Sequence, residues 1–177
     1  FAIDEGGFLH PDGVVNPGGG LTPDVVFQSK RPGDHHGLIF IDTLDQTAPR
    51  ADNLGTLRLH TAYLEGHVAM QGHVVLAPSG FGQSISILSP PDAEQTGNRA
   101  RTPISLSRIH FNGVLSAAGN ITVAGSARVY GAVVAGGTII SNSGGTLEVW
   151  YEHDLAQGLY RGVPLVYRAP GAWVAQY

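Results

Sequence analysis

The sequence contains no cysteine, one methionine and very little lysine among its 177 residues. The absence of cysteine excludes disulfides, thiol catalysis and cysteine-ligated zinc or iron–sulfur sites. Lys30 is the only lysine among ten basic residues, and the others are arginines. This composition favours a GC-rich or heat-adapted source.

Long apolar runs are also absent. No window offers the roughly 18 consecutive apolar residues that a membrane-spanning helix requires, so we expect no membrane contact from this segment. The first residues, 1–7, lack an initiator methionine and the charged-then-apolar pattern of a secretion signal. We therefore expect the chain to be part of a longer, membrane-anchored precursor.

Helical periodicity is nearly absent, whereas glycine and proline are frequent, with 25 and 11 residues. Apolar residues make up 42% of the chain and charged residues only 14%, which is enough to bury one core of ordinary size. The net charge of −4 repels polyanions at long range. Any binding of nucleic acid must therefore be local.

Glycine recurs every six residues, at 113, 119, 125, 131 and 137, in the hexads GVLSAA, GNITVA, GSARVY, GAVVAG and GTIISN. Apolar or small residues alternate with polar ones inside each hexad, which is the two-residue period of a strand. The same pattern occurs in GHVAMQ and GHVVLA at 66–77. The third and fifth hexad positions are predicted to face the core; they are Leu115, Ile121, Ala127, Val133, Ile139, Ala117, Val123, Val129, Ala135, Ser141, Val68, Met70, Val74 and Leu76.

A short fixed period of glycine and β-branched residues is typical of a β-helix, whose coils stack about 4.8 Å apart. The sequence therefore predicts an all-β solenoid over residues 37–150. We expect an irregular Gly/Pro-rich segment at 1–36, an excursion loop at 89–103, and a non-repetitive capping or return segment at 151–177. A β-sandwich with glycine-rich hairpins is the alternative fold.

Catalytic and metal-binding motifs are missing. Neither GxSxG nor HExxH occurs, and the paired carboxylates have no nucleophile or base beside them. Among eight histidines, His67 and His73 follow hexad glycines and are predicted to lie on neighbouring outer faces, while His35 and His36 follow a Pro-Gly turn. The sequence thus predicts no enzyme activity, no metal site and no cofactor.

Basic side chains gather at a few places, where they are candidates for contacting the phosphates of DNA. The strongest pair lies in the predicted loop, because its long side chains can reach a ligand without disturbing the core. The candidates are Lys30, Arg31, Arg58, Arg99, Arg101 and Arg108. Aromatic residues that could stack on unpaired bases are Phe81, Phe111, Tyr130, Trp150 and Tyr151.

The segment 113–174 combines glycine-punctuated strands with the aromatic pair at 150–151, a Tyr-x-x-Asp-Leu stretch at 151–155 and a Pro-Gly-x-Trp stretch at 170–173. These features resemble the C-terminal region of large PilX-like minor pilins, and among them the competence-associated ones. The resemblance implies an extracellular domain at or near the tip of a type IV pilus, other minor pilins as partners, and DNA capture in natural transformation. The methylation motif and apolar helix of a whole pilin are absent, so the chain would correspond to the exposed head.

Two hypotheses of different classes follow. The first is a binding module that holds DNA through its arginines without sequence readout. The second is a structural or self-assembling β-helix without DNA binding, comparable to a bactofilin polymer or an adhesin stalk. A carbohydrate-active β-helix would need more carboxylates than the hexads contain.

Overall fold

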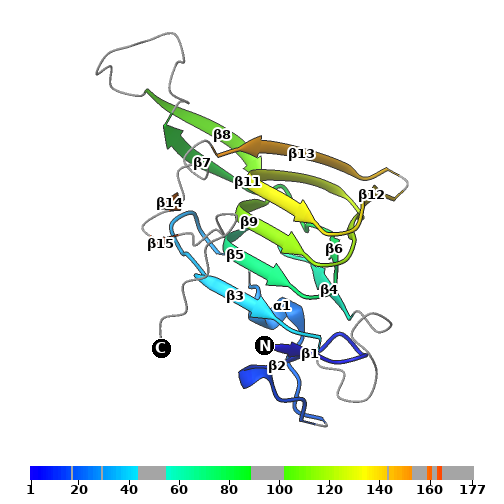
Figure 1. The fold of residues 1–177 in the computed structure, drawn as a ribbon. Helices are drawn as coiled ribbons and strands as arrows, with labels where there is room; N and C mark the ends of the chain where they lie inside the picture. Colours follow the sequence, from blue (N-terminus) through cyan, green and yellow to red (C-terminus); the bar gives the residue numbers. More distant parts are fainter. Residues whose placement is uncertain are drawn as a thin grey trace, which may run out of the picture.

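The computed structural model describes residues 1–16, 18–28, 30–43, 55–88, 102–142, 144–152, 159–160 and 163–164. Its centre consists of two parallel sheets with the strand orders β13-β11-β9-β5-β3 and β12-β10-β6-β4 (Figure 1). Five strands form the larger sheet: β3 (Leu38–Ile41), β5 (Leu64–Met70), β9 (Phe111–Ala117), β11 (Ser126–Ala135) and β13 (Thr146–Tyr151). Four form the smaller: β4 (Thr56–Leu59), β6 (His73–Leu76), β10 (Ile121–Val123) and β12 (Ile139–Ser141).

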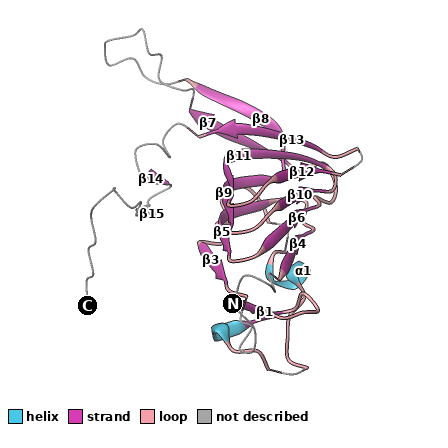
Figure 2. Cartoon of the chain, turned by 45° about the vertical axis from the view of Figure 1, so that its right-hand side comes forward, coloured by secondary structure: helices cyan, strands magenta, loops and turns pink. Residues whose placement is uncertain are grey.

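The core lies between these two sheets, which face each other in Figure 2. The prediction of core-facing positions is confirmed for 66–77 and for the first three hexads, whose third and fifth residues are all buried. In the last two hexads, Val133 and Ala135 are only partly buried, while Ile139 and Ser141 are exposed. Ile139 and Ser141 lie on β12, the last strand of the smaller sheet, and residues 132–135 of β11 extend beyond the part that β13 pairs with, so fewer strands cover these side chains.

Glycines occupy one row across the larger sheet. Gly66, Gly113 and Gly131 are register partners on β5, β9 and β11, and all three have positive φ angles, of 154°, 149° and 138°. A Cβ atom on Gly131 would collide with the carbonyl oxygen of Gly113. The hexad glycine is therefore required here by the close approach of neighbouring backbones.

The first 28 residues cover one end of the core (Figure 1). They contain β1 (Ala2–Ile3), β2 (Leu9–His10), a 3₁₀ turn (Pro11–Gly13) and α1 (Pro23–Val26). Pro23 is well placed at the start of α1, because the first N–H groups of a helix have no hydrogen-bond partner within the helix and proline lacks this group. The negative charge of Asp24 interacts favourably with the positive end of the helix dipole. The side chains of Ile3, Leu9 and Phe27 are buried in the core.

An antiparallel hairpin, β7 (Gln83–Leu88) with β8 (Pro103–Ile109), projects from the opposite end (Figure 1). It packs on the outer face of the larger sheet through a second apolar cluster of Tyr63, Ile85, Leu106, Ile109 and Tyr130. A short antiparallel pair, β14 (Leu159–Tyr160) and β15 (Val163–Pro164), completes the described strands.

The prediction of an all-β solenoid is wrong. The structure is mixed α/β, with two mostly parallel sheets, the helix α1 and antiparallel strand pairs. The glycine period specifies the parallel strands of 66–77 and 113–141, but other local signals act outside it, such as the Thr-Pro-Asp start of α1. Most of the predicted loop, 89–101, and most of the segment 151–177 lie outside the described residues.

Candidate functional site

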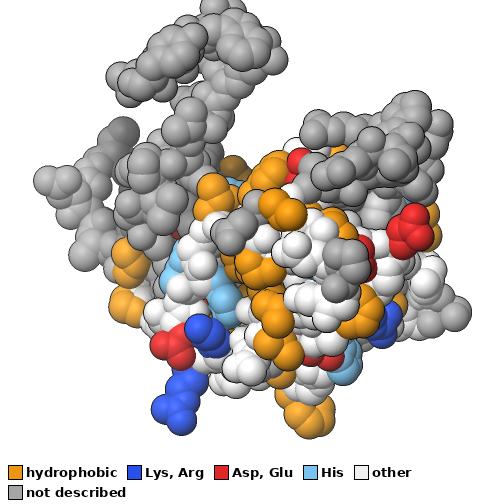
Figure 3. Space-filling model, turned by 90° about the horizontal axis from the view of Figure 1, so that it is seen from below, with side chains coloured by type: hydrophobic (Ala, Val, Ile, Leu, Met, Phe, Trp, Pro, Cys, Tyr) orange, Lys and Arg blue, Asp and Glu red, His pale blue; other side chains and the backbone are white. Residues whose placement is uncertain are grey.

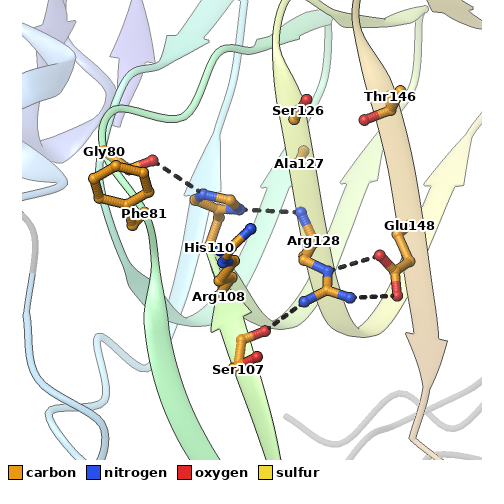
Figure 4. Close-up of a pocket in the computed structure, with 10 residues that line it drawn as sticks. All are labelled: Gly80, Phe81, Ser107, Arg108, His110, Ser126, Ala127, Arg128, Thr146 and Glu148. Carbon is orange, nitrogen blue, oxygen red and sulfur yellow. Dashed lines mark hydrogen bonds and ion pairs between the residues drawn. The ribbon is translucent and has the colours of Figure 1, made fainter.

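An open groove of about 650 Å³ lies where the hairpin meets the outer face of β11 and β13 (Figure 4). Alternation along the strands places every second side chain on this outer face. The two strands contribute Ser126, Arg128, Thr146 and Glu148; Gly80, Phe81, Ser107, Arg108 and His110 line the other side. The groove thus combines polar and charged side chains with apolar surface, and one aromatic ring, that of Phe81, lines it.

Arg128 and Glu148 form an ion pair inside the groove. They are register partners on β11 and β13, and Arg128 Nε and Nη2 donate to Glu148 Oε2 and Oε1 at 2.6 and 2.9 Å. Arg128 Nη1 also donates to the carbonyl oxygen of Ser107 at 2.8 Å, and Trp150 Nε1 donates to Glu148 Oε1 at 2.6 Å. The hydrogen bonds from Arg128 and then Trp150 lower the pKa of Glu148. The charge of Arg128 is therefore compensated.

His110 connects the groove to the turn before the hairpin. The backbone N–H of Arg128 donates to His110 Nδ1 at 3.1 Å, and His110 Nε2 lies 3.4 Å from the carbonyl oxygen of Gly80. Since Nδ1 accepts, the proton is on Nε2 and the ring is neutral in this arrangement. Burial lowers the pKa of His110, the Gly80 contact raises it in part, and the charge of Arg128 lowers it again. The ring holds the turn that carries Phe81.

Two further residues of the groove, Arg108 and Phe81, have side chains that can contact a ligand. Arg108 takes a left-handed backbone, with φ of 59°, and no ion pair holds its guanidinium within the part of the chain that the structure describes. Phe81 is 84% exposed, the largest exposed fraction of any large apolar side chain described. Beside Arg108, Gly82 at φ 70° leaves room for the crossing backbone, because a Cβ there would meet Ile109. A cation and an aromatic face are thus held free at one rim.

The other predicted phosphate contacts do not join this groove. Lys30 and Arg31 lie in the segment before β3, where their backbone N–H groups donate to Tyr63 O and Asp34 Oδ2. Arg58 lies on β4 of the smaller sheet. Figure 3, which views the end that carries β1 and α1, shows basic side chains at two places on opposite sides of the view and apolar side chains gathered near the middle. Arg99 and Arg101 lie outside the described residues.

The candidate aromatic residues divide into two groups. Phe111 is in the core and Tyr130 lies beneath the hairpin, with exposed fractions of 1% and 5%. Phe81, Trp150 and Tyr151 are exposed, and Phe81 lines the groove. The structure therefore brings one predicted arginine and one predicted aromatic residue together.

Sequence reasoning missed the ion pair and the histidine of the groove. Arg128 stands at an outward hexad position and Glu148 lies beyond the hexads, 20 residues later, and only the strand register shows that they meet. His110 precedes the hexads and carries no motif. The signal that could have found them is the alternation itself, which places Ser126, Arg128 and Tyr130 on one outer face.

The histidines form no metal centre among the described residues, where no group of three metal-ligating side chains occurs. His73 Nδ1 instead accepts a hydrogen bond from the backbone N–H of Asn120 at 2.9 Å, and His35 Nδ1 accepts one from Gly37 at 2.8 Å. Burial lowers the pKa of both His36 and His67. Within the described ranges, no helix has the length and apolar character needed to cross a membrane.

Comparison of the chain with family models, with curated proteins and with solved structures finds no match.

Proposed function

We propose that this chain is the exposed head of a type IV pilus minor pilin that captures DNA without sequence readout through the groove of Phe81 and Arg108. The single observation that carries the binding site is the position of these two side chains on one groove. Proteins that hold single-stranded nucleic acid combine cations along the backbone with aromatic faces for the bases. The groove has a cation that pairs with no described side chain, Arg108, and an aromatic ring, Phe81.

The proposed contacts follow from the chemistry of the rim. The guanidinium of Arg108 binds a phosphate, and an unpaired base stacks on the ring of Phe81. The hydroxyls of Ser126 and Thr146 line the same groove and offer hydrogen bonds to sugar or phosphate oxygens. None of these groups distinguishes one base from another, so binding is independent of sequence.

Binding by this groove is expected to be weak and sensitive to salt. Among the described residues, one uncompensated cation lines the groove, because the guanidinium of Arg128 is paired with Glu148. The net charge of −4 opposes the approach of DNA at long range. Useful capture therefore depends on many copies or on further contacts from partner subunits.

The pilus assignment is supported by the aromatic pair at 150–151, the Tyr-x-x-Asp-Leu stretch at 151–155 and the Pro-Gly-x-Trp stretch at 170–173. They are the features that resemble PilX-like minor pilins of the competence-associated type. In this proposal the domain is extracellular, belongs to a longer membrane-anchored precursor and assembles with other minor pilins near the pilus tip.

Titration of a fluorescent single-stranded oligonucleotide, followed by anisotropy at low and high salt, tests the groove. Arg108→Asn removes the cation while keeping a residue that tolerates the left-handed backbone. It is expected to weaken binding at low salt and to reduce the slope of log affinity against log salt by about 0.7, the value for one single-strand phosphate. Arg58→Gln removes an equal charge from the other sheet and should leave both quantities unchanged.

Phe81→Ala separates stacking from charge. We expect it to weaken single-stranded binding by about 1–3 kcal/mol and to leave the salt slope unchanged. Absence of binding at low salt, or equal losses for Arg108→Asn and Arg58→Gln, would exclude this groove as the DNA site. A structural domain without DNA binding would then be the better assignment, and it would fit the outer edges of β12 and β13, with which no described strand pairs.

A further inference from the structure

The two ends of the paired sheets differ. At the end of β3 and β4, residues 1–28 cover the core, and β1 even continues the sheet, because Ile3 N donates to Asp42 O and Phe1 N donates to Phe40 O, each at 2.9 Å. At the other end, β13 and β12 are the last strands of their sheets. Within the described residues, no strand pairs with the outer edge of either.

The hydrogen bonds to β11 show which backbone groups of β13 face outward. Thr146 N donates to Gly125 O at 3.2 Å, and Glu152 N donates to Gly131 O at 3.3 Å. Backbone groups alternate sides along a strand, so even-numbered residues of β13 face β11. The N–H and C=O groups of Leu147, Val149 and Tyr151 therefore point away from the sheet.

Several side chains at this edge are apolar and exposed, and the charge of Glu148 on β13 is paired with that of Arg128. Val149 and Tyr151 are 43% and 58% exposed, and Ile139 on β12 is 48% exposed although it occupies a predicted core position. Edge strands are normally protected by lysine, proline or a bulge. Neither Thr146–Tyr151 nor Ile139–Ser141 contains lysine or proline, and the register of β13 on β11 is unbroken.

We propose that β13 pairs antiparallel with β13 of a second copy, around a two-fold axis at Val149. This register matches Val149 with itself and Leu147 with the second copy's Tyr151, so the hydrogen-bonded pairs join residues with outward backbone groups. It also sets Glu148 opposite the second copy's Trp150, which avoids two carboxylates facing each other. The apolar side chains of Leu147 and Val149 then cover one another.

The covered end explains why the assembly closes as a dimer. A head-to-tail chain of copies would have to pair β13 with β3, but the edge of β3 is already bonded to residues 1–3. Of the two edges of the larger sheet that the structure describes, the one left for β13 is therefore that of another β13, and an interface of this isologous kind closes after two copies.

The dimer also places two DNA grooves next to each other, since Glu148 lines the groove and is bonded to Trp150 on the shared edge. Two linked sites raise the effective affinity for a strand that reaches both. The pairing does not depend on DNA binding, because neither Arg108 nor Phe81 lies on the proposed interface.

Sedimentation velocity of the full chain over a wide range of concentration tests the proposal. We expect a reversible shift from one chain to twice its mass, without larger species. Val149→Pro removes an N–H that β11 does not use, so it should abolish the dimer while the circular dichroism spectrum is retained. Val149→Thr keeps the N–H and the branched shape and should still form the dimer. Arg108→Asn should form it as the parent does.

Amide hydrogen exchange provides a second readout that does not depend on the proline variant folding. The amides of Leu147, Val149 and Tyr151 should become protected only as concentration rises. A monomer at all concentrations, filaments instead of dimers, or an unchanged dimer in Val149→Pro would overturn the proposal. Protection of these amides in the monomer would overturn it too, because another part of the same chain would then cover the edge.

Discussion

Arg128 and Glu148 face each other across β11 and β13, and two charge-assisted hydrogen bonds of 2.6 and 2.9 Å join the guanidinium to the carboxylate. The pair lies in the groove that we assign to DNA. Its geometry keeps one cation of the groove from binding phosphate, and this gives the first prediction.

Glu148→Gln should strengthen DNA binding. The change removes the carboxylate that lines the groove among the described residues and releases Arg128, which is then free to contact a second phosphate. We expect tighter binding at low salt and a slope of log affinity against log salt that is steeper by about 0.7. Anisotropy titrations of parent and variant at several salt concentrations measure both. A variant that binds no better than the parent would show that Arg128 cannot reach the ligand.

The pH dependence of stability should depend on His110. Its pKa is lowered from 6.5, first by burial, so the unfolded chain takes up a proton at higher pH than the folded one. The free energy of unfolding therefore decreases as pH falls below about 6.5, and it continues to decrease until the pH reaches the lowered pKa. Chemical denaturation of the parent and of His110→Gln across this range should give a shallower pH dependence in the variant.

His36 and His67 share this direction, because burial also lowers the pKa of each. They remain in His110→Gln, so the variant should retain part of the pH dependence. An identical pH dependence in parent and variant would mean that folding does not change the pKa of His110.

Much of the local structure could be predicted from the sequence, because alternation and glycine spacing act over a few residues. Four residues that were predicted to face the core have exposed fractions of 2% or less: Val68, Met70, Leu115 and Ile121. The fold class was wrong, since alternation specifies which side chains face inward but not how the connecting segments fold. The helix α1 and the β7–β8 hairpin carry no hexad glycine.

The candidate site depended on information that the sequence does not contain. Arg108 and Phe81 were both candidates, but 27 positions separate them, and only the packing of the hairpin on the larger sheet brings them to one groove. Arg58 looked equivalent to Arg108 in sequence, yet it lies on the other sheet. The pairing of distant strands decides which charges meet.

A matched pair of glycine substitutions tests the row of close backbone approaches. Gly131→Ala places a Cβ against the carbonyl oxygen of Gly113 at a φ of 138°, so we expect a loss of about 3 kcal/mol or more in the free energy of unfolding. Gly125→Ala meets nothing within 4 Å and should change stability by less than about 1 kcal/mol. Urea denaturation measures both, and equal effects would contradict the assigned register.

The buried carboxylate of Glu65 gives the last prediction. Its side chain is 1% exposed and accepts hydrogen bonds at Oε2 from Tyr63 Oη at 2.5 Å, Asn112 Nδ2 at 3.2 Å and Gly33 N at 3.0 Å. Tyr63→Phe keeps the packing of the ring but removes one donor to a charged group, which should lower the free energy of unfolding by about 1.5–3 kcal/mol.

The same network fixes the segment before β3 to the larger sheet. The side chain of Glu65 accepts a hydrogen bond from Gly33 N, and the backbone carbonyl oxygen of Glu65 accepts one from His36 N. Tyr63→Phe should therefore also speed amide exchange at Gly33, because the Glu65 carboxylate that accepts the Gly33 N–H would be held by one hydrogen bond fewer. Tyr151→Phe removes a hydroxyl from an exposed tyrosine and should change neither quantity. If Tyr63→Phe were as stable as Tyr151→Phe, the hydrogen bond to Glu65 would not contribute to the fold.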